Sequence, residues 1–339
     1  MGIASVNVIN LSDLTTSWNW LRDEFKHTND EWHHYSSLGV SLPAFLPKKD
    51  SIARIIAAGK AVKLARKSPS VLVSHGPRPA MYAGNISKII CPKTAHLVYS
   101  FNFTDLPNGK QHSLMTRAYQ QPTKFVTYSS VERKLYADYF DIPIEKIDML
   151  HWAVHAPKVD LTETALIAGR YICALGSQGR DYATLFAAMK KLPTIKLAVV
   201  ANTDSIIGLN IPKNVKIYTN IPLAQAHNIL AHSEFMVLPL RDSQVPCGHV
   251  TIVSSMFFNK AIVVTNSLGV QDYIFDNKTG LFCEPKNAHD LSEKIKSLWD
   301  DSAKNTRLSA AGLAFANEYC TEKTAINYFA EFLKKHSPA

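Results

Sequence analysis

Short apolar runs rich in β-branched residues alternate with stretches of helical periodicity along the whole chain. Strands that alternate with helices in this way form parallel sheets whose two faces are covered by helices, so the pattern predicts an α/β fold. The expected strands of the first half are residues 5–11, 70–75, 95–101 and 124–129. Those of the second half are residues 170–176, 196–202, 214–220, 234–240 and 261–266. Two such sets predict two doubly wound domains.

The length of 339 residues supports this division, since a single hydrophobic core rarely grows so large. Helical periodicity stops near HWAVHAPKVDLTET, where prolines and polar residues collect. We therefore expect a first domain over residues 1–155, a second over 156–320, and a C-terminal helix and tail over 321–339 that could cross back to the first domain. We interpret His151 and His155 as linker and cleft residues, not as a metal-binding pair.

The composition indicates in which cellular compartment the protein is expected. No apolar run approaches the length that spans a bilayer, and the first residues lack the basic start and apolar centre of a signal peptide. The five cysteines are odd in number, widely spaced and never in a CxxC pair, which argues for a reducing compartment and against structural zinc. We therefore expect a cytoplasmic protein.

The formal charge of +9 suits anionic partners, although a soluble surface explains it equally well. Many of the basic residues lie in KKDSIARIIAAGKAVKLARK, residues 48–67, where apolar residues recur at helical spacing, namely Ile52, Ile55, Ile56, Val62 and Leu64. This amphipathic helix either packs on its own domain only, or also rests its basic face on anionic lipid, as a peripheral protein on the inner face of the cytoplasmic membrane. Nucleic acid is not an expected partner, because no basic stripe interleaved with aromatic residues accompanies the helix.

Three loops that follow strands of the second half combine glycines with hydrogen-bond donors. In open α/β sheets, ligands bind beyond the carboxyl ends of the strands, where helix N-termini present free N–H groups. The candidate residues of these loops, ALGSQGRDY, PLRDSQVPCGHVT and TNSLGVQDY, are Gly176, Gly179, Arg180, Arg241, Gly248, His249, Val250, Thr251 and Gly269. Asn220, at the end of another strand, is a further candidate. Together they predict a binding site for a diphosphate.

Other phosphate-binding patterns are missing. GxGxxG follows no strand and the Walker A lysine pattern does not occur, so neither a dinucleotide oxidoreductase nor an NTPase is expected. No two aspartates lie two residues apart, so the paired-aspartate metal site of the other large class of sugar transferases has no candidate. We expect no metal and no cofactor other than a nucleotide co-substrate.

Residues 248–295 resemble the C-terminal donor motif of GT-B glycosyltransferases, especially the family-four group. The matching positions are Met256, Lys260, Val263, Val264, Thr265, Gly269, Asp272, Asp276, Thr279, Gly280 and Leu281. Residues 172–189 look like the first donor loop of that family, with Arg180 near its phosphate-binding lysine, and residues 127–154 resemble the end of its N-terminal domain. The resemblance implies the GT-B fold, in which two Rossmann-like domains face each other across a cleft, the first binding the acceptor and the second the nucleotide sugar.

Two positions depart from the family pattern. Pro246 and Ser254 stand where the family has glutamates, of which the first contacts the donor sugar and the second the ribose. Ser254 can still hydrogen-bond a ribose hydroxyl, but with one short hydroxyl instead of a charged acceptor. Arg180, Arg241 and the helix start at residues 249–251 are expected to stabilise the leaving diphosphate, although Arg180 could instead form a surface ion pair with its neighbour.

The resemblance places the acceptor at strand ends of the first domain. The candidates there are His75 in SHGPRP and Asn102 and Asp105 in SFNFTDLP. An inverting transferase needs a base, for which Asp105 or His75 could serve, whereas a retaining one relies on the donor phosphate. Both residues also suit a turn at a strand end without any catalytic role.

The leading interpretation is a glycosyltransferase that moves a sugar from a nucleotide-diphosphate donor, with uridine as the first guess, to a lipid-linked or polysaccharide acceptor of the cell envelope. A GT-B sugar-nucleotide epimerase is one alternative. A catalytically silent GT-B scaffold that binds nucleotide or a partner protein is another, which the two missing glutamates support.

Overall fold

The computed structural model describes residues 6–14, 19–26, 28, 30–157, 164–241 and 245–336. The chain divides into two compact units: unit 1 comprises Met1–Leu150 and Lys323–Ala339, and unit 2 comprises His151–Glu322. These boundaries lie a few residues from those expected at 155 and 320. Parts of four expected segments fall outside the described residues: Ser5 of the first expected strand, 158–163 of the connecting segment, 242–244 of the loop after residue 240, and 337–339 of the C-terminal tail.

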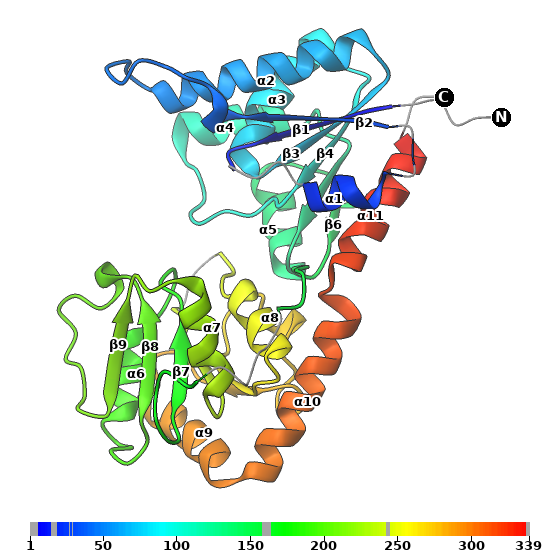
Figure 1. Cartoon of the computed structure of the whole chain (residues 1–339). Helices are drawn as coiled ribbons and strands as arrows, with labels where there is room; N and C mark the ends of the chain where they lie inside the picture. Colours follow the sequence, from blue (N-terminus) through cyan, green and yellow to red (C-terminus); the bar gives the residue numbers. More distant parts are fainter. Residues whose placement is uncertain are drawn as a thin grey trace. The chain divides into compact units, whose positions relative to one another are not determined.

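In the described part of unit 1, six parallel strands form one sheet in the order β2-β1-β3-β4-β5-β6 (Figure 1). They are β1 (Asn7–Ser12), β2 (Glu31–Ser36), β3 (Ser70–His75), β4 (Ala95–Tyr99), β5 (Lys124–Thr127) and β6 (Ile147–Met149). The order reverses between β1 and β3, which makes the carboxyl ends of these two strands the place where an open sheet binds ligands.

Two strands of this sheet were not expected from the sequence. β2 has the sequence EWHHYS and lies at the sheet edge with its residues half-buried or exposed, and β6 at the opposite edge has three residues. Neither forms an apolar run, because an edge strand buries less of its surface than a central one.

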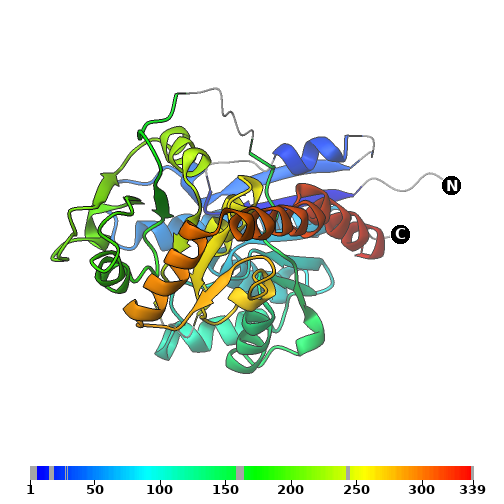
Figure 2. The same cartoon turned by 90° about the horizontal axis from the view of Figure 1, so that it is seen from below.

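The helices of unit 1 are α1 (Asn19–Glu24), α2 (Lys49–Lys67), α3 (Pro77–Ile90), α4 (Gly109–Tyr119), α5 (Ser130–Tyr139) and α11 (Glu322–His336), with short 3₁₀ turns η1 (Ser37–Gly39) and η2 (Ile144–Lys146). α11 comes from the far end of the sequence and packs beside β4 and β6 (Figures 1 and 2). Its Tyr328 hydroxyl donates to an Asp148 carboxylate oxygen at 2.8 Å, and the Phe329 ring lies 5.1 Å from the Tyr99 ring.

The structure corrects the expected apolar face of α2. The side chains that this helix buries are mainly alanines, namely Ala53, Ala57, Ala58, Ala61, Val62 and Ala65, whereas Ile55 is 48% exposed. Alanines four residues apart lie on one side of a helix and let it approach the sheet closely, and α2 packs on β1, β3 and α3. The helical spacing of the isoleucines alone did not show that the alanine face, next to them on the helix, is the buried one.

In unit 2, six described strands form a second parallel sheet in the order β12-β11-β10-β7-β8-β9. They are β7 (Ile172–Leu175), β8 (Leu197–Ala201), β9 (Val215–Thr219), β10 (Met236–Leu238), β11 (Ile262–Thr265) and β12 (Leu281–Cys283). This is the order of the dinucleotide-binding doubly wound fold, and it reverses between β7 and β10. The short edge strand β12 was not expected from the sequence.

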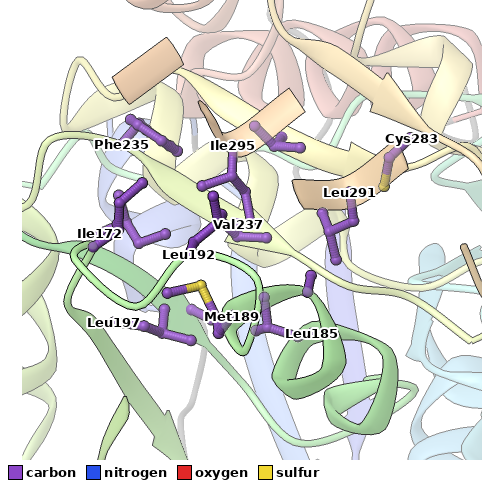
Figure 3. Close-up of a cluster of buried hydrophobic side chains, with 14 of the residues drawn as sticks. Ile172, Leu185, Met189, Leu192, Leu197, Phe235, Val237, Cys283, Leu291 and Ile295 are labelled. Atoms are coloured by element: carbon purple, nitrogen blue, oxygen red, sulfur yellow. The ribbon is translucent and has the colours of Figure 1, made fainter. Parts of the chain in front are cut away.

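The helices of unit 2 are α6 (Tyr182–Met189), α7 (Leu223–His232), α8 (His249–Phe257), α9 (Ala288–Asp300) and α10 (Ser302–Tyr319), with 3₁₀ turns η3 (Thr203–Ser205) and η4 (Val270–Asp272). Side chains alternate along the strands, so that Val237 faces α6 and α9 while Met236 faces α7 and α8. Figure 3 shows the first of these two cores, with Met189 and Leu185 from α6 and Ile295 and Leu291 from α9 gathered around the strand residues. Helices on both faces of a parallel sheet confirm the predicted α/β doubly wound fold.

Candidate functional site

A pocket of about 350 Å³ lies at the carboxyl ends of the strands of unit 2. Loops after β7, β8 and β9 and the first turns of α7 and α8 line it, and β7 is one of the two strands at the switch point. The lining contains five of the residues predicted from the sequence, namely Gly176, Asn220, Val250, Thr251 and Ser254. Strand-end loops that lie far apart in the sequence are thus brought to one place by the parallel order of the sheet.

Arg180 lies behind this pocket, and its side chain is 5% exposed. Its guanidinium donates hydrogen bonds to the Leu175 carbonyl at 3.1 Å, the Gln178 carbonyl at 2.7 Å and the Thr251 hydroxyl at 2.8 Å. Burial lowers the pKa of Arg180 from its ordinary value. The alternative of a surface ion pair is therefore wrong, because Arg180 is a buried cation that joins the loop after β7 to the start of α8.

The two glycines of the first loop are required by the space around them. Gly176 has φ of 101°, and a Cβ there would lie 2.5 Å from Nη2 of Arg180. Gly179 has φ of 67°, and a Cβ there would lie 2.6 Å from Sγ of Cys247. Both positions combine a left-handed backbone with close approach, so that only glycine fits without a local shift.

Gly248 is the N-cap of α8 and has φ of 96°. The first hydrogen bond within the helix runs from the N–H of Ile252 to the Gly248 carbonyl at 2.9 Å. The N–H groups of residues 249–251 precede that bond and have no carbonyl partner within the helix. They lie at the positive end of the helix dipole, where an anion is stabilised.

His249, by contrast, points into the protein. Its side chain is buried and its ring stacks on Tyr273, with ring centres 4.8 Å apart and planes at 22°. Burial lowers the pKa of His249 to about 4, so the imidazole is neutral at pH 7. The imidazole therefore packs against Tyr273, which follows η4, whereas the backbone N–H of His249 belongs to the start of α8.

Arg241 is exposed and contacts the first loop rather than the pocket lining. Its backbone N–H donates to the Gly179 carbonyl at 2.8 Å and its Nε to the Arg180 carbonyl at 2.9 Å. Gly179, Arg180, Arg241, Gly248, His249 and Gly269 are thus not among the residues that line the pocket.

A second pocket, of about 550 Å³, lies at the strand ends of unit 1. The predicted acceptor residues His75, Asn102 and Asp105 all line it, together with Asp13 after β1 and Arg78 at the start of α3. His75 is buried, its Nε2 lies 3.3 Å from Oδ1 of Asn10, and burial lowers its pKa to about 3. A neutral imidazole with so low a pKa is a weak base.

Asp105 is exposed and belongs to a loop that α5 holds at two points. The Tyr136 hydroxyl accepts a hydrogen bond from the Phe103 N–H at 3.2 Å and donates to the buried carboxyl of Glu132, also at 3.2 Å. The Tyr139 hydroxyl donates to the Pro107 carbonyl at 2.6 Å. The loop that carries Asp105 thus has a fixed backbone, although Asp105 itself faces solvent.

Sequence reasoning missed several pocket residues that directly follow strands. Asp13 follows β1 and forms an ion pair with Arg54 of α2 at 2.7 Å. Ser177 and Asn202 follow β7 and β8 in unit 2. Their positions after strand ends were a usable signal, whereas His227, on α7, had no such signal.

The histidines of the connecting segment have separate partners. His151 Nε2 donates to the Asp272 carbonyl at 2.9 Å, and Nδ1 of the exposed His155 lies 3.0 Å from a carboxylate oxygen of Glu322. Within the described residues, no three His, Cys, Asp or Glu side chains are placed to hold a metal ion.

Comparison with known families matches residues 182–314 to the family described as "Glycosyl transferases group 1". The comparison with curated proteins gives no match. Among solved structures, a glycosyltransferase from Rickettsia africae has a TM-score of 0.70 at 14% identity, with 98% of this chain and 99% of that chain covered.

Two further structures are similar over the whole chain. The HepE protein of Anabaena in complex with UDP has a TM-score of 0.73 at 12% identity, covering 98% of this chain and 100% of that chain. Sucrose-phosphate synthase from Thermosynechococcus elongatus has a TM-score of 0.73 at 12% identity, covering 97% and 98%. At these identities the likeness establishes the fold, which is the GT-B fold expected from the sequence.

Proposed function

We propose that this chain, a GT-B glycosyltransferase, binds a nucleotide-diphosphate sugar in the pocket of unit 2 and transfers its sugar to a glycan or lipid-linked acceptor. The observation that carries the proposal is the joining of that pocket to the uncapped start of α8 by the buried Arg180. A concave, largely apolar pocket suits a nucleoside, and an adjoining helix N-terminus suits its diphosphate. The HepE structure in complex with UDP supports uridine as the base.

The chain would accelerate the reaction mainly by stabilising the leaving diphosphate. Cleavage of the bond between sugar and phosphate increases the negative charge on the diphosphate in the transition state. The N–H groups of residues 249–251 are oriented before the reaction, since Gly248 fixes the helix start. Donors held in place stabilise developing charge without reorganisation, and one such donor contributes about 3 kcal/mol. Arg180 holds the loops around this charge and adds a positive charge behind them.

For the acceptor we propose the pocket of unit 1. Asp105 is the better candidate for binding or deprotonating an acceptor hydroxyl, because it is exposed in a loop of fixed backbone while His75 is a buried weak base. A retaining reaction would use Asp105 for binding only, and the transferred proton would go to the donor phosphate.

We also propose that unit 1 contacts an anionic membrane surface, where a lipid-linked precursor of the cell envelope would be presented. The support is the exposed basic side of α2 together with large apolar side chains in the segment that precedes it, of which Phe45 is 87% exposed and Leu38 62% exposed. Basic side chains at a lipid surface contribute about 1 kcal/mol each, and apolar side chains insert into the interface. Within the described residues, no helix has the length and apolarity needed to cross a membrane.

The decisive experiment is to incubate the purified protein with UDP-sugars and to follow the release of UDP and the fate of the sugar. Release of UDP that increases on addition of a glycan or lipid-linked acceptor supports glycosyl transfer. Conversion of one UDP-sugar into another without acceptor would instead indicate an epimerase. Binding with no turnover of any sugar nucleotide would indicate a silent scaffold, and the absence of binding would refute the assignment of the pocket.

A further inference from the structure

The pocket of unit 2 is lined without a formal charge. Its described lining residues include no Asp, Glu, Lys or Arg. The polar side chains among them belong to Ser177, Asn202, Asn220, His227, Thr251 and Ser254. Away from the start of α8 and the buried Arg180, a ligand of this pocket therefore meets only neutral hydrogen-bonding side chains and apolar contacts.

Several of these polar groups already have protein partners. The Ser177 hydroxyl accepts a hydrogen bond from the Asn202 N–H at 2.7 Å. The Thr251 hydroxyl accepts from Arg180 at 2.8 Å, and the Asn202 side chain accepts from the Ser205 N–H at 3.0 Å. These bonds fix the loops and leave few acceptors for a ligand.

Ser254 is different. It is half-buried on α8, lines the pocket, and its hydroxyl makes no hydrogen bond to the described part of the chain. Ser254 comes four positions after Val250, so it lies about 6 Å further along the axis of α8 than Val250 does. If the diphosphate lies at the helix start, this is the position of the ribose.

We propose that the pocket discriminates only weakly between ribonucleotides and 2′-deoxyribonucleotides, so that deoxynucleoside-diphosphate sugars, such as a thymidine-linked donor, are also ligands of this enzyme; the inference rests on the proposed function. A charged acceptor would bind a ribose hydroxyl strongly, and a ligand lacking that hydroxyl would leave a buried charge unpaired. When the acceptor is a serine, a ligand without the 2′-hydroxyl costs only one neutral hydrogen bond, and the serine hydroxyl can bind water instead. Loss of the 2′-hydroxyl should therefore weaken binding about fivefold, and no more than about tenfold.

The test is calorimetric titration of the whole protein with matched pairs of diphosphates, UDP and dUDP first, followed by the adenine, guanine and cytosine pairs. We expect the best-bound base to give a ratio of ribo to deoxy affinity below tenfold. In Ser254→Ala, affinity for the ribonucleotide should fall to that for the deoxynucleotide, while affinity for the deoxynucleotide stays unchanged. Ser177→Ala is the control, because it loosens a loop of the same pocket and should weaken both ligands by one common factor.

A ratio above tenfold in the wild type would overturn the inference and leave the proposed function standing. A ratio below tenfold that Ser254→Ala does not change would remove Ser254 from ribose recognition. Failure of every diphosphate to bind would refute the proposed function itself, and the inference with it. One set of titrations therefore distinguishes failure of the inference from failure of the proposed function.

Discussion

Replacing Arg180 with alanine separates the structural role of this residue from the role proposed for it at the leaving diphosphate. The substitution removes three hydrogen bonds, to the carbonyls of Leu175 and Gln178 and to the hydroxyl of Thr251. A bond to a charged donor is worth about 1.5–3 kcal/mol, but the cost of keeping a cation buried disappears with the side chain, so we expect a net loss of about 2–4 kcal/mol. For a unit of this size that loss lowers the melting temperature by about 5–15 °C.

The same variant should turn over its sugar nucleotide about a hundredfold more slowly at a temperature where it remains folded, because the charge behind the leaving diphosphate is lost. The assay combines a melting curve with the rate of UDP release. Arg170→Ala is the control, since Arg170 is an exposed arginine of the same unit, paired with Glu234 at 2.9 Å and stacked on Trp299; its loss should cost under about 1 kcal/mol and leave turnover unchanged. A lower melting temperature with normal turnover would leave Arg180 a structural role only, and wild-type values of both would refute the reasoning.

Gly248→Val should abolish binding of UDP in calorimetry, because φ of 96° strains any other residue and a Cβ would lie 3.2 Å from Leu238; near-wild-type affinity would place the diphosphate elsewhere. His249→Gln should bind UDP almost normally but melt earlier, since the backbone N–H remains while the ring stacking on Tyr273 is lost; complete loss of binding would make the imidazole a ligand. Exchange of three exposed lysines of α2 for glutamate should release the protein from anionic liposomes while UDP affinity is retained, and unchanged sedimentation would argue against membrane contact; the three are Lys60, Lys63 and Lys67. Burial raises the pKa of Glu132 from 4.5 to about 7, so the folded state holds this proton more tightly than the unfolded chain does. The stability that results is complete below pH 4.5 and is lost as the pH rises through 7. Unit 1 should therefore lose up to about 3 kcal/mol between pH 4.5 and 8, and Glu132→Gln should flatten this dependence in pH-resolved melting; an unchanged slope would assign it to other groups.

The sequence predicted the central strands and the loops that follow them because both depend on local pattern. β3 and β11 are apolar runs buried on both faces, and the glycines after β7 mark a backbone that other residues cannot follow. The edge strand β2 was missed because an edge strand needs no apolar run, and β12 was missed because its apolar run has only three residues. The order of the strands, and so the meeting of the 176 and 250 loops, follows from packing between distant segments.

Side-chain direction was the other limit. Arg180 was expected to face an anion, yet it is buried against carbonyls, because the space left open by Gly176 admits its guanidinium. His249 was expected to offer its backbone N–H at a helix start, and the sequence did not indicate that its ring stacks on Tyr273. Spacing in a sequence locates the backbone of a residue, whereas the destination of a long side chain depends on neighbours that the sequence does not identify.

The placement of α11 on unit 1 has a consequence for synthesis on the ribosome. Unit 1 is made of two stretches separated by the whole of unit 2, and its buried Phe329 belongs to the second stretch. At translation rates of 5–20 residues per second, the first stretch waits roughly 10–30 s for α11 to emerge. During that interval the surface around Tyr99 is uncovered in the nascent chain, and unit 2, whose residues are all made before those of α11, can complete its fold first. The unit whose first stretch precedes unit 2 in the chain is therefore the unit that is completed last, and we expect ribosome-associated chaperones to engage it during that delay.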